Sequence, residues 1–553
     1  MEENEQITST EQNQNVARDA AIVSLAVMGS RLLGLAREMV IFYYFKTKLA
    51  APAFHLAFRI PNFLRDMFGE GILSKAFITT FIATEKEEGE AAAWDLANRI
   101  FNLVVIVLTG IVVLGIVFSP AIVDVLAREN FDEVLEPGKH YGFDTKVELT
   151  IYLTQLMFPY LLFVSLAAIA MGLLNSKGRF GIPACASSFF NLSSLVIGIS
   201  GYYLFQRIDM HPTTGMAVGV LVGGILQFLI QVPSMYRVGY RYRPLLSFTE
   251  PRVVQVLKLV GPAILGVAAV PINQLTNTWF ITSGDEWLAW IQGAYRIMHF
   301  PLGIFGVAIS TVILPQLAKY AHSDSMAEFR DSLSYALRLM LTVILPASIG
   351  LMILAEPICR LLYERGEFTD TDTVATAHVL FVYAFGLCGF SALKIVTDGF
   401  YAFKDIRAPV IVSLCGVALN ICMNYMFIFQ GFWLNERAIV FSTVTTVTLN
   451  SVVLLFLLRR RIDKIGFNLV FKVALKVLCA SVVMGVVCWV SNGFIEKDWL
   501  GTEGIVSRTL NVFLPIGFSV LTLAGMYKAL KVSEFDDILN IVKQRFQKQI
   551  IVK

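Results

Sequence analysis

The chain has 553 residues and a net charge of +3, and 56% of its residues are hydrophobic while only 16% are charged. Soluble globular domains have about 25% charged residues, so this composition excludes an ordinary soluble domain and indicates a membrane protein. The small net charge gives no indication of nucleic-acid binding. Apolar segments of about 20 residues, the length of one membrane crossing, recur along the chain, so we predict an all-α polytopic membrane protein.

The N-terminal segment, residues 1–20, is polar and acid-rich. It lacks the basic region and the small-residue cleavage site of a secretory signal peptide, so we expect the first apolar segment to be retained. The seven cysteines lie in or beside apolar segments without CxxC spacing. This distribution favours small core residues over disulfide bonds or metal ligands.

Apolar segments of spanning length predict about 14 transmembrane helices. In chain order they cover residues 21–45, 54–84, 100–126, 149–174, 185–205, 216–235, 253–281, 287–317, 333–354, 375–402, 410–428, 438–458, 471–490 and 510–527.

Lysine and arginine in the short loops indicate the orientation. A cytoplasmic N-terminus places more of them inside, which the positive-inside rule favours, and an even number of spans then places the C-terminus inside too. We predict that residues 531–553 form an amphipathic cytoplasmic tail at the membrane surface. The basic residues of the predicted inside loops are Lys177, Arg179, Arg237, Arg241, Arg243, Lys404, Arg407, Arg459, Arg460, Arg461 and Lys464.

Two stretches resemble each other and indicate an internal repeat. Ala57-Phe-Arg-Ile60 matches Ala294-Tyr-Arg-Ile297, and the same phenylalanine and glycine positions follow each stretch. Repeats of this kind are common in transporters, whereas the alternative is chance similarity between apolar segments. We predict two six-helix lobes around a central cavity, an N-lobe at 21–240 and a C-lobe at 253–459, with two further helices in 470–530.

The first span contains two arginines, Arg31 and Arg37. An arginine at the centre of a membrane helix costs about 2.5–3.5 kcal/mol on insertion scales and normally faces a cavity or a partner. At about 100° per residue, Arg31 and Glu38 share a face of the helix, whereas Arg37 lies about 120° from Arg31. We therefore expect several helices to border the cavity that receives both arginines.

Further charged residues extend this candidate site. The second predicted span contributes Arg59, Arg65 and Glu70, and the eighth contributes Arg296. Guanidinium groups stay charged and match phosphate oxygens bidentately, so clustered arginines suit a diphosphate. The alternative for each arginine is an ion pair or a side chain that extends to the membrane surface, particularly for Arg59 and Arg65 near the span ends.

The motifs that carry these residues closely resemble the MurJ (MviN) family of lipid II flippases of bacterial peptidoglycan synthesis. The strongest matches are Gly-Ser-Arg-Leu-Leu-Gly-Leu-Ala-Arg-Glu at 29–38 and the stretch from Ala57 to Phe77. Asn175 to Pro183, Gly366 to Thr369 and Asp405 to Pro409 agree as well, so the resemblance spans nearly the whole chain. It implies 14 helices of the multidrug/oligosaccharidyl-lipid/polysaccharide exporter fold, with alternating access.

The resemblance also implies a site. Essential arginines of the family correspond to Arg31, Arg37, Arg65 and Arg296, which would line a cationic cavity for a diphosphate and sugar headgroup. Asn62 and Glu70 lie within the same family motif, and we add Glu38 and Arg59 to the expected substrate-binding residues. Helices corresponding to 470–530 form a groove thought to hold the lipid tail.

The function implied is a flippase that moves lipid II, an undecaprenyl-diphosphate-linked disaccharide peptide, from the inner to the outer leaflet of the bacterial cytoplasmic (inner) membrane. This activity belongs to peptidoglycan and cell-wall biogenesis and to cell shape. Besides lipid II, we expect membrane lipids and cell-wall synthesis proteins as partners, no nucleic acid and no cofactor. Na⁺ or the membrane potential would drive the cycle.

Two positions depart from the family pattern. The family commonly has an acid where this chain has Pro52, and another where it has Tyr295. We therefore expect a more positive cavity or compensation by other residues.

A polar cluster in the second half gives a candidate metal site. Asn420 and Asn424 are four residues apart and so share one helix face. Some family members have a sodium site with an Asn and an Asp at this spacing, but hard cations prefer anionic oxygen ligands and the acid position here is Asn424. Amide hydrogen bonds between helices are the favoured interpretation.

Other function classes have less support. The one enzyme-like string, Asp370-Thr-Asp372, precedes a predicted helix, where acids serve as caps. The chain has no Walker A, HExxH or G-x-S-x-G motif, which favours a transporter over an enzyme. A flippase for another lipid-linked oligosaccharide, a drug or ion antiporter of the same fold, and a scaffold for cell-wall enzymes stay open as alternatives.

Overall fold

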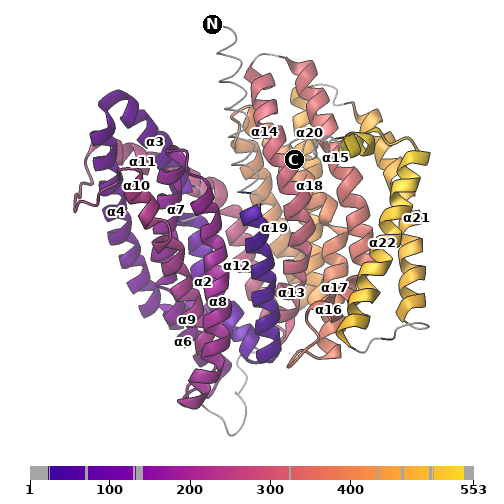
Figure 1. The fold of residues 1–553 in the computed structure, drawn as a ribbon, viewed down its shortest axis with the longest axis horizontal. Coiled ribbons are helices and arrows are strands. Elements are labelled where there is room, and N and C mark those ends of the chain that lie inside the picture. The colour runs from indigo at the N-terminus through magenta and orange to yellow at the C-terminus, as the bar shows by residue number, and fades with distance from the viewer. Residues whose placement is uncertain are drawn as a thin grey trace, which may run out of the picture. The chain divides into compact units, whose positions relative to one another are not determined.

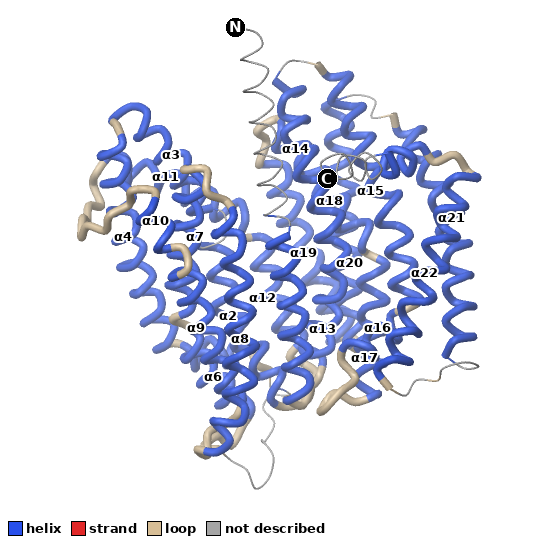
Figure 2. Tube along the Cα trace, viewed as in Figure 1, coloured by secondary structure: helices blue, strands red, loops and turns tan. Residues whose placement is uncertain are grey.

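The computed structural model describes residues 23, 25–68, 72–128, 131, 141–322, 325–431, 435–462, 466–496, 501 and 504–540. Within these residues the ordered elements are helices and no β-strand occurs (Figure 2). The prediction of an all-α fold is confirmed. The predicted N-terminal segment 1–20 and most of the predicted tail lie outside the described residues.

The first helix covers residues 25–44. The later elements are α2 (Ala50–Phe68), α3 (Ile72–Glu88), α4 (Glu90–Val117), α5 (Ser119–Leu126), α6 (Lys146–Met157), α7 (Tyr160–Ser176), α8 (Gly181–Arg207), α9 (Thr213–Leu229), α10 (Val232–Arg237), α11 (Pro251–Val267), α12 (Ala269–Ile281), α13 (Trp287–Pro301), the π-helix η2 (Leu302–Gly306), α14 (Val307–His322), α15 (Met326–Ile353), α16 (Ala355–Leu362), α17 (Asp370–Phe385), α18 (Leu387–Ala402), α19 (Arg407–Phe429), α20 (Glu436–Ile462), α21 (Phe467–Phe494) and α22 (Ile505–Ala529).

The predicted spans all overlap helices of the described chain, but several are interrupted. A bend of 41° at Gly386 separates α17 from α18. A turn at Phe158 and Pro159 separates α6 from α7, because proline lacks the backbone N–H that would continue the helix. In the described part of the chain, nine helical segments are long and apolar enough to cross a membrane, or up to ten with the bent pair. The number of 14 membrane crossings stays a prediction.

Packing divides the chain into two compact units, residues 1–289 and 290–553. In the first unit, α3, α4 and α7 share an apolar core that includes Phe77, Leu96 and Leu173. Small residues let α8 and α9 approach closely, since a Cβ on Gly201 would lie 2.5 Å from the Cα of Gly215. Close contacts of this kind are typical of helix pairs in membranes.

In the second unit, α15 packs against α21, and α18 and α19 pack against α20 (Figure 1). α22 lies beside α21, and the hydroxyl of Tyr527 on α22 donates to the carbonyl of Thr342 on α15 at 2.7 Å. Glu534, in the helical residues 533–540, forms an ion pair with Arg338 of α15. The second unit therefore binds the C-terminal helices tightly. The predicted lobe boundaries at 21–240, 253–459 and 470–530 stay predictions.

Candidate functional site

The arginine-bearing first helix is fixed by α8. The side-chain amide of Asn191 donates to the carbonyl of Ser30 at 3.0 Å and lies 3.1 Å from the Ser30 hydroxyl. Arg31 follows directly and is half-buried. Buried polar contacts of this kind set the rotation of a helix, because a rotation would leave the amide unsatisfied.

Arg37 is 5% exposed and lies among aromatic rings. Its Cζ atom is 5.4 Å from the ring centroid of Phe58 on α2 and 5.4 Å from that of Phe190 on α8. The ring of Tyr160 on α7 is 5.3 Å from that of Phe190 and 6.1 Å from that of Phe58. We call Phe58, Tyr160 and Phe190 the aromatic cage. Guanidinium–ring contacts are worth about 0.5–2 kcal/mol, more when water is excluded.

Arg65 contacts the same cage. Its Nη1 atom donates to the Tyr160 hydroxyl at 3.5 Å, while Nη2 forms an ion pair with Asp66 at 2.8 Å. The ring of Tyr160 thus packs against the two rings that surround Arg37, and its hydroxyl accepts a hydrogen bond from Arg65. The structure places these two predicted arginines around one aromatic group.

Two further predicted residues lie on α2. Arg59 donates from Nη1 to the hydroxyl of Thr278 on α12 at 2.7 Å. This contact favours the structural alternative for Arg59, because it joins two helices. The side-chain oxygen of Asn62 is buried, and no described residue donates a hydrogen bond to it. An acceptor in this state suits a donor from a ligand.

Glu38 pairs with a residue that we did not predict. Its Oε1 atom lies 3.1 Å from Nε2 of His55 on α2, and both side chains are buried. This contact joins the first helix to α2. No sequence spacing marks this pair, because the two residues lie on different helices.

The remaining predicted residues lie elsewhere. Glu70 falls outside the described residues. Arg296 is half-buried on α13 in the second unit, next to Tyr295, whose ring centroid is 3.9 Å from that of His299. α13 ends at Pro301, and the π-helix η2 follows. Such π-turns inside helices often mark functional sites.

The candidate metal residues form an amide cluster between α19 and α20. Asn424 Nδ2 donates to Asn420 Oδ1 at 3.1 Å, and Asn420 Nδ2 donates to the hydroxyl of Ser442 at 3.1 Å. The Ser442 hydroxyl in turn donates to Asn424 Oδ1. Because these atoms satisfy one another, the arrangement favours hydrogen bonding between helices over sodium binding. The sodium site stays a prediction.

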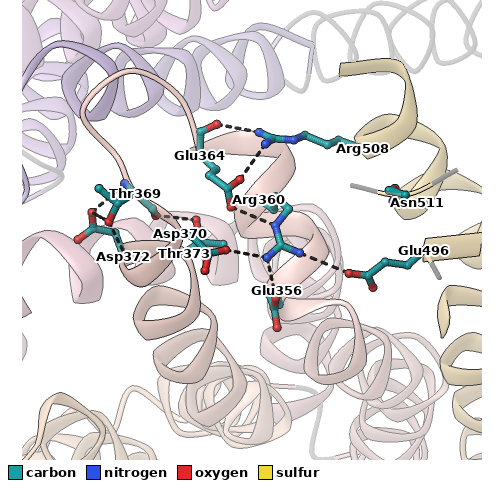
Figure 3. Close-up of polar contacts among 11 residues, drawn as sticks. Glu356, Arg360, Glu364, Thr369, Asp370, Asp372, Thr373, Glu496, Arg508 and Asn511 are labelled. Atoms are coloured by element: carbon teal, nitrogen blue, oxygen red, sulfur yellow. Dashed lines mark hydrogen bonds and ion pairs between the residues drawn. The ribbon is translucent and has the colours of Figure 1, made fainter. Parts of the chain in front are cut away.

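The enzyme-like string Asp370-Thr-Asp372 is a helix cap. Asp372 N donates to the Thr369 hydroxyl at 3.3 Å, and Asp372 Oδ2 accepts from Thr369 N at 2.9 Å (Figure 3). This reciprocal pair is a capping box at the start of α17. Asp372 Oδ1 also accepts from the indole of Trp290 at 2.8 Å. The prediction of a cap is confirmed.

The fold matches solved membrane transporters. A structure described as lipid II flippase MurJ in an inward closed conformation has a TM-score of 0.73 and 24% identity, covering 92% of this chain and 99% of that chain. An inward-facing multidrug resistance MATE family transporter of the MOP superfamily has a TM-score of 0.66 and 16% identity, covering 80% and 98%. This chain therefore has the fold that these two solved structures share.

Sequence comparison shows the family to which the chain belongs. The model for lipid II flippase MurJ matches residues 41–505. A Vibrio cholerae protein named "Probable lipid II flippase MurJ" is 31% identical over 92% of this chain and 95% of its own length. A Burkholderia cenocepacia "Lipid II flippase MurJ" is 30% identical over 92% of this chain and 98% of its own length. The chain belongs to the lipid II flippase MurJ family.

Proposed function

We propose that this protein is a flippase that moves lipid II from the inner to the outer leaflet of the bacterial cytoplasmic membrane. Membership of the lipid II flippase MurJ family supports lipid II as the substrate. The observation that carries the proposal is the environment of Arg37, a buried arginine held by an aromatic cage, with Arg65 on the same cage. A buried guanidinium in a membrane-spanning chain indicates a functional site.

The chemistry of the crossing explains the need for these residues. A diphosphate with attached sugars must lose its water to pass the hydrocarbon core, and this loss is costly. Fixed guanidinium groups replace that water with charge-assisted hydrogen bonds. Arg31, Arg37 and Arg65 bind the diphosphate in this proposal, and the oxygen of Asn62 accepts a hydrogen bond from a sugar hydroxyl or amide.

Alternating access completes the proposal. Arg296, with the π-helix shortly after it, contributes from the C-lobe and closes on the headgroup before the cavity opens to the other leaflet. Glu38 supplies negative charge that Pro52 and Tyr295 do not. Na⁺ or the membrane potential supplies the energy, and the protein works as a transporter without a cofactor.

The basic loops and the exposed apolar side chains support the proposed arrangement in the membrane. The basic loops support cytoplasmic termini by the positive-inside rule. Large apolar side chains on α21 and α22 are exposed, among them Trp489 and Leu521. Such surfaces support a groove at 470–530 that holds the lipid tail. Cell-wall synthesis proteins are further proposed partners.

Depletion of the protein from cells tests this function. We expect the fraction of lipid II that an outer-leaflet probe can reach to fall, and a wild-type copy to restore it. A scaffold for cell-wall enzymes would leave that fraction unchanged. A drug antiporter is disfavoured, because cationic drugs require carboxylates and the first helices are rich in arginine.

A further inference from the structure

Two charged residues that the proposed transport cycle does not use lie on α18, within the second unit (Figure 1). Asp398 is 8% exposed, and Lys394, one helical turn earlier, is half-buried. α17 and α18 together form one bent spanning segment. Charge within such a segment is costly, so charged residues there normally face a partner or a polar cavity and mark a functional site.

Asp398 fixes α18 to the helix that follows the π-helix. The hydroxyl of Ser310 on α14 donates to Asp398 Oδ2, and both side chains are buried. At the next residue α18 approaches α20 closely, since a Cβ on Gly399 would lie 2.8 Å from a methyl carbon of Leu458. These contacts set the rotation of α18 about its axis, because a rotation would take the buried carboxylate away from its donor.

This rotation gives α18 an accessible polar face. From Lys394 to the end of α18, the residues that are not buried are Lys394, Thr397 and Tyr401, which follow one another at helical spacing. On α22, by contrast, exposed side chains such as Val520 and Leu521 are apolar and suit contact with lipid. The accessible face of α18 therefore suits water or a polar ligand.

The position of Lys394 disfavours a side chain that only extends to the membrane surface. Lys394 precedes Ala402, the last residue of α18, by about 12 Å along the helix axis. Helical side chains tilt toward the N-terminus, so the lysine points away from that end. Its ammonium has three N–H donors and no acceptor, so an anionic ligand fits it. Asp398 supplies opposite charge one turn away, which lowers the cost of the lysine within the span.

The distance from Arg296 indicates which anion this would be. Arg296 on α13 precedes Ser310 on α14 by about 20 Å along the helix axis. α18 runs in the same direction as α14, because Ser391 lies beside Gly306 and the later contact with Ser310 lies one turn beyond Lys394. Lys394 and Arg296 are therefore about 15 Å apart along these helices. The two cations suit different parts of one long headgroup.

The lipid II headgroup offers a second anion at such a distance. Its diphosphate carries two sugars and a peptide, and a peptide ends in a carboxylate. Each extended peptide residue adds about 3.3–3.6 Å, so the carboxylate can lie about 15 Å or more from the diphosphate. An ammonium binds a carboxylate through charge-assisted hydrogen bonds.

We propose that Lys394 binds the terminal carboxylate of the lipid II peptide, while Arg296 and the arginines of the first unit hold the diphosphate end. This assignment rests on the proposed function and deepens it, because the protein then recognises the peptide end of the headgroup as well as the diphosphate. Asp398 is a positioning residue that fixes α18 through Ser310 and does not contact the substrate.

Binding of two forms of lipid II to the purified full-length protein in vesicles tests this role. One form has a free terminal carboxylate, and the other has a terminal carboxamide. Wild type should bind the carboxylate form at least about fivefold more tightly. Lys394→Gln should bind both forms as wild type binds the carboxamide, whereas Lys394→Arg should keep the preference. Lys472→Gln, at an exposed lysine of α21, is the matched control and should behave as wild type.

The outcomes separate this subsite from the proposed function. Equal binding of the two forms by wild type would overturn the role of Lys394 and leave lipid II transport intact. A preference retained in Lys394→Gln would overturn it too, as would an equal loss of both forms in the folded variant, which would assign Lys394 to the diphosphate. Failure of wild type to bind either form would overturn the proposed function and this subsite together. If Lys394→Gln does not fold, Lys394→Met, which keeps an apolar stem without the charge, replaces it.

Discussion

Two arginines, the buried Arg37 and the half-buried Arg360, have opposite surroundings. Arg37 packs against the rings of Phe58 and Phe190, whereas Arg360 is surrounded by four carboxylates. An aromatic ring attracts a guanidinium through its face and does not compete with a phosphate for N–H donors in the way that a carboxylate does. Four carboxylates therefore give Arg360 a structural role, whereas the aromatic neighbours of Arg37 suit it to ligand binding.

The largest expected effect is that of Arg37→Ala on transport. Charge-assisted hydrogen bonds are worth about 1.5–3 kcal/mol, so we expect about a 10- to 100-fold loss of lipid II exposure at the outer leaflet. Labelling of lipid II in the outer leaflet of cells measures this loss of exposure. The matched control is Arg243→Ala, an exposed arginine of the same unit, which should transport normally. Normal transport by both variants would show that Arg37, like Arg360, has no role in substrate binding.

Arg360→Ala should act on stability. Removing this cation leaves the carboxylates with Arg508 alone, and like charges then repel. Because Asp370 and Glu356 are exposed, we expect about 1–3 kcal/mol of lost stability, less than for a fully buried pair. The melting temperature of the purified protein measures it. A melting temperature that falls no further than in Arg243→Ala would show that the cluster is not structural.

Phe190→Leu should weaken the aromatic cage and keep the site apolar. A lost guanidinium–ring contact is worth about 0.5–2 kcal/mol, so transport should fall about two- to thirtyfold while the protein stays folded. The same labelling assay applies, with Phe248→Leu, at an exposed loop position, as the control. Equal rates in the two variants would argue against a role for the ring.

The smallest effect is expected from Tyr160→Phe. This change removes one hydroxyl, which accepts a long hydrogen bond of 3.5 Å from Arg65. A bond this weak is worth less than about 1 kcal/mol, so transport should fall by no more than about fivefold. A loss as large as that of Arg37→Ala would mean that the hydroxyl contacts the substrate itself.

The sequence predicts part of this molecule for identifiable reasons. Apolar length locates the helices, since each crossing must cover the hydrocarbon core, and the cost of charge within a span singles out Arg31 and Arg37. The breaks at Pro159 and Gly386 are local and were missed, because apolar segments continue through both positions.

Contacts between distant segments were not predictable. The chain has 42 phenylalanines, and nothing in the sequence distinguishes Phe190 as a neighbour of Arg37. His55 pairs with Glu38 across two helices, and the carboxylates around Arg360 come from separate segments. Such groups are defined by packing, which periodicity in one helix does not reveal.

The role of Arg37 in binding the diphosphate is tested most directly by the rate of lipid II flipping in vesicles that contain purified Arg37→Lys protein, compared with wild type and with Arg243→Lys. Lysine keeps the charge but loses the planar, bidentate geometry of the guanidinium. We predict that Arg37→Lys folds with a near-normal melting temperature and flips lipid II at least about tenfold more slowly, while Arg243→Lys matches wild type. A wild-type rate for Arg37→Lys would contradict the claim that this guanidinium binds the diphosphate.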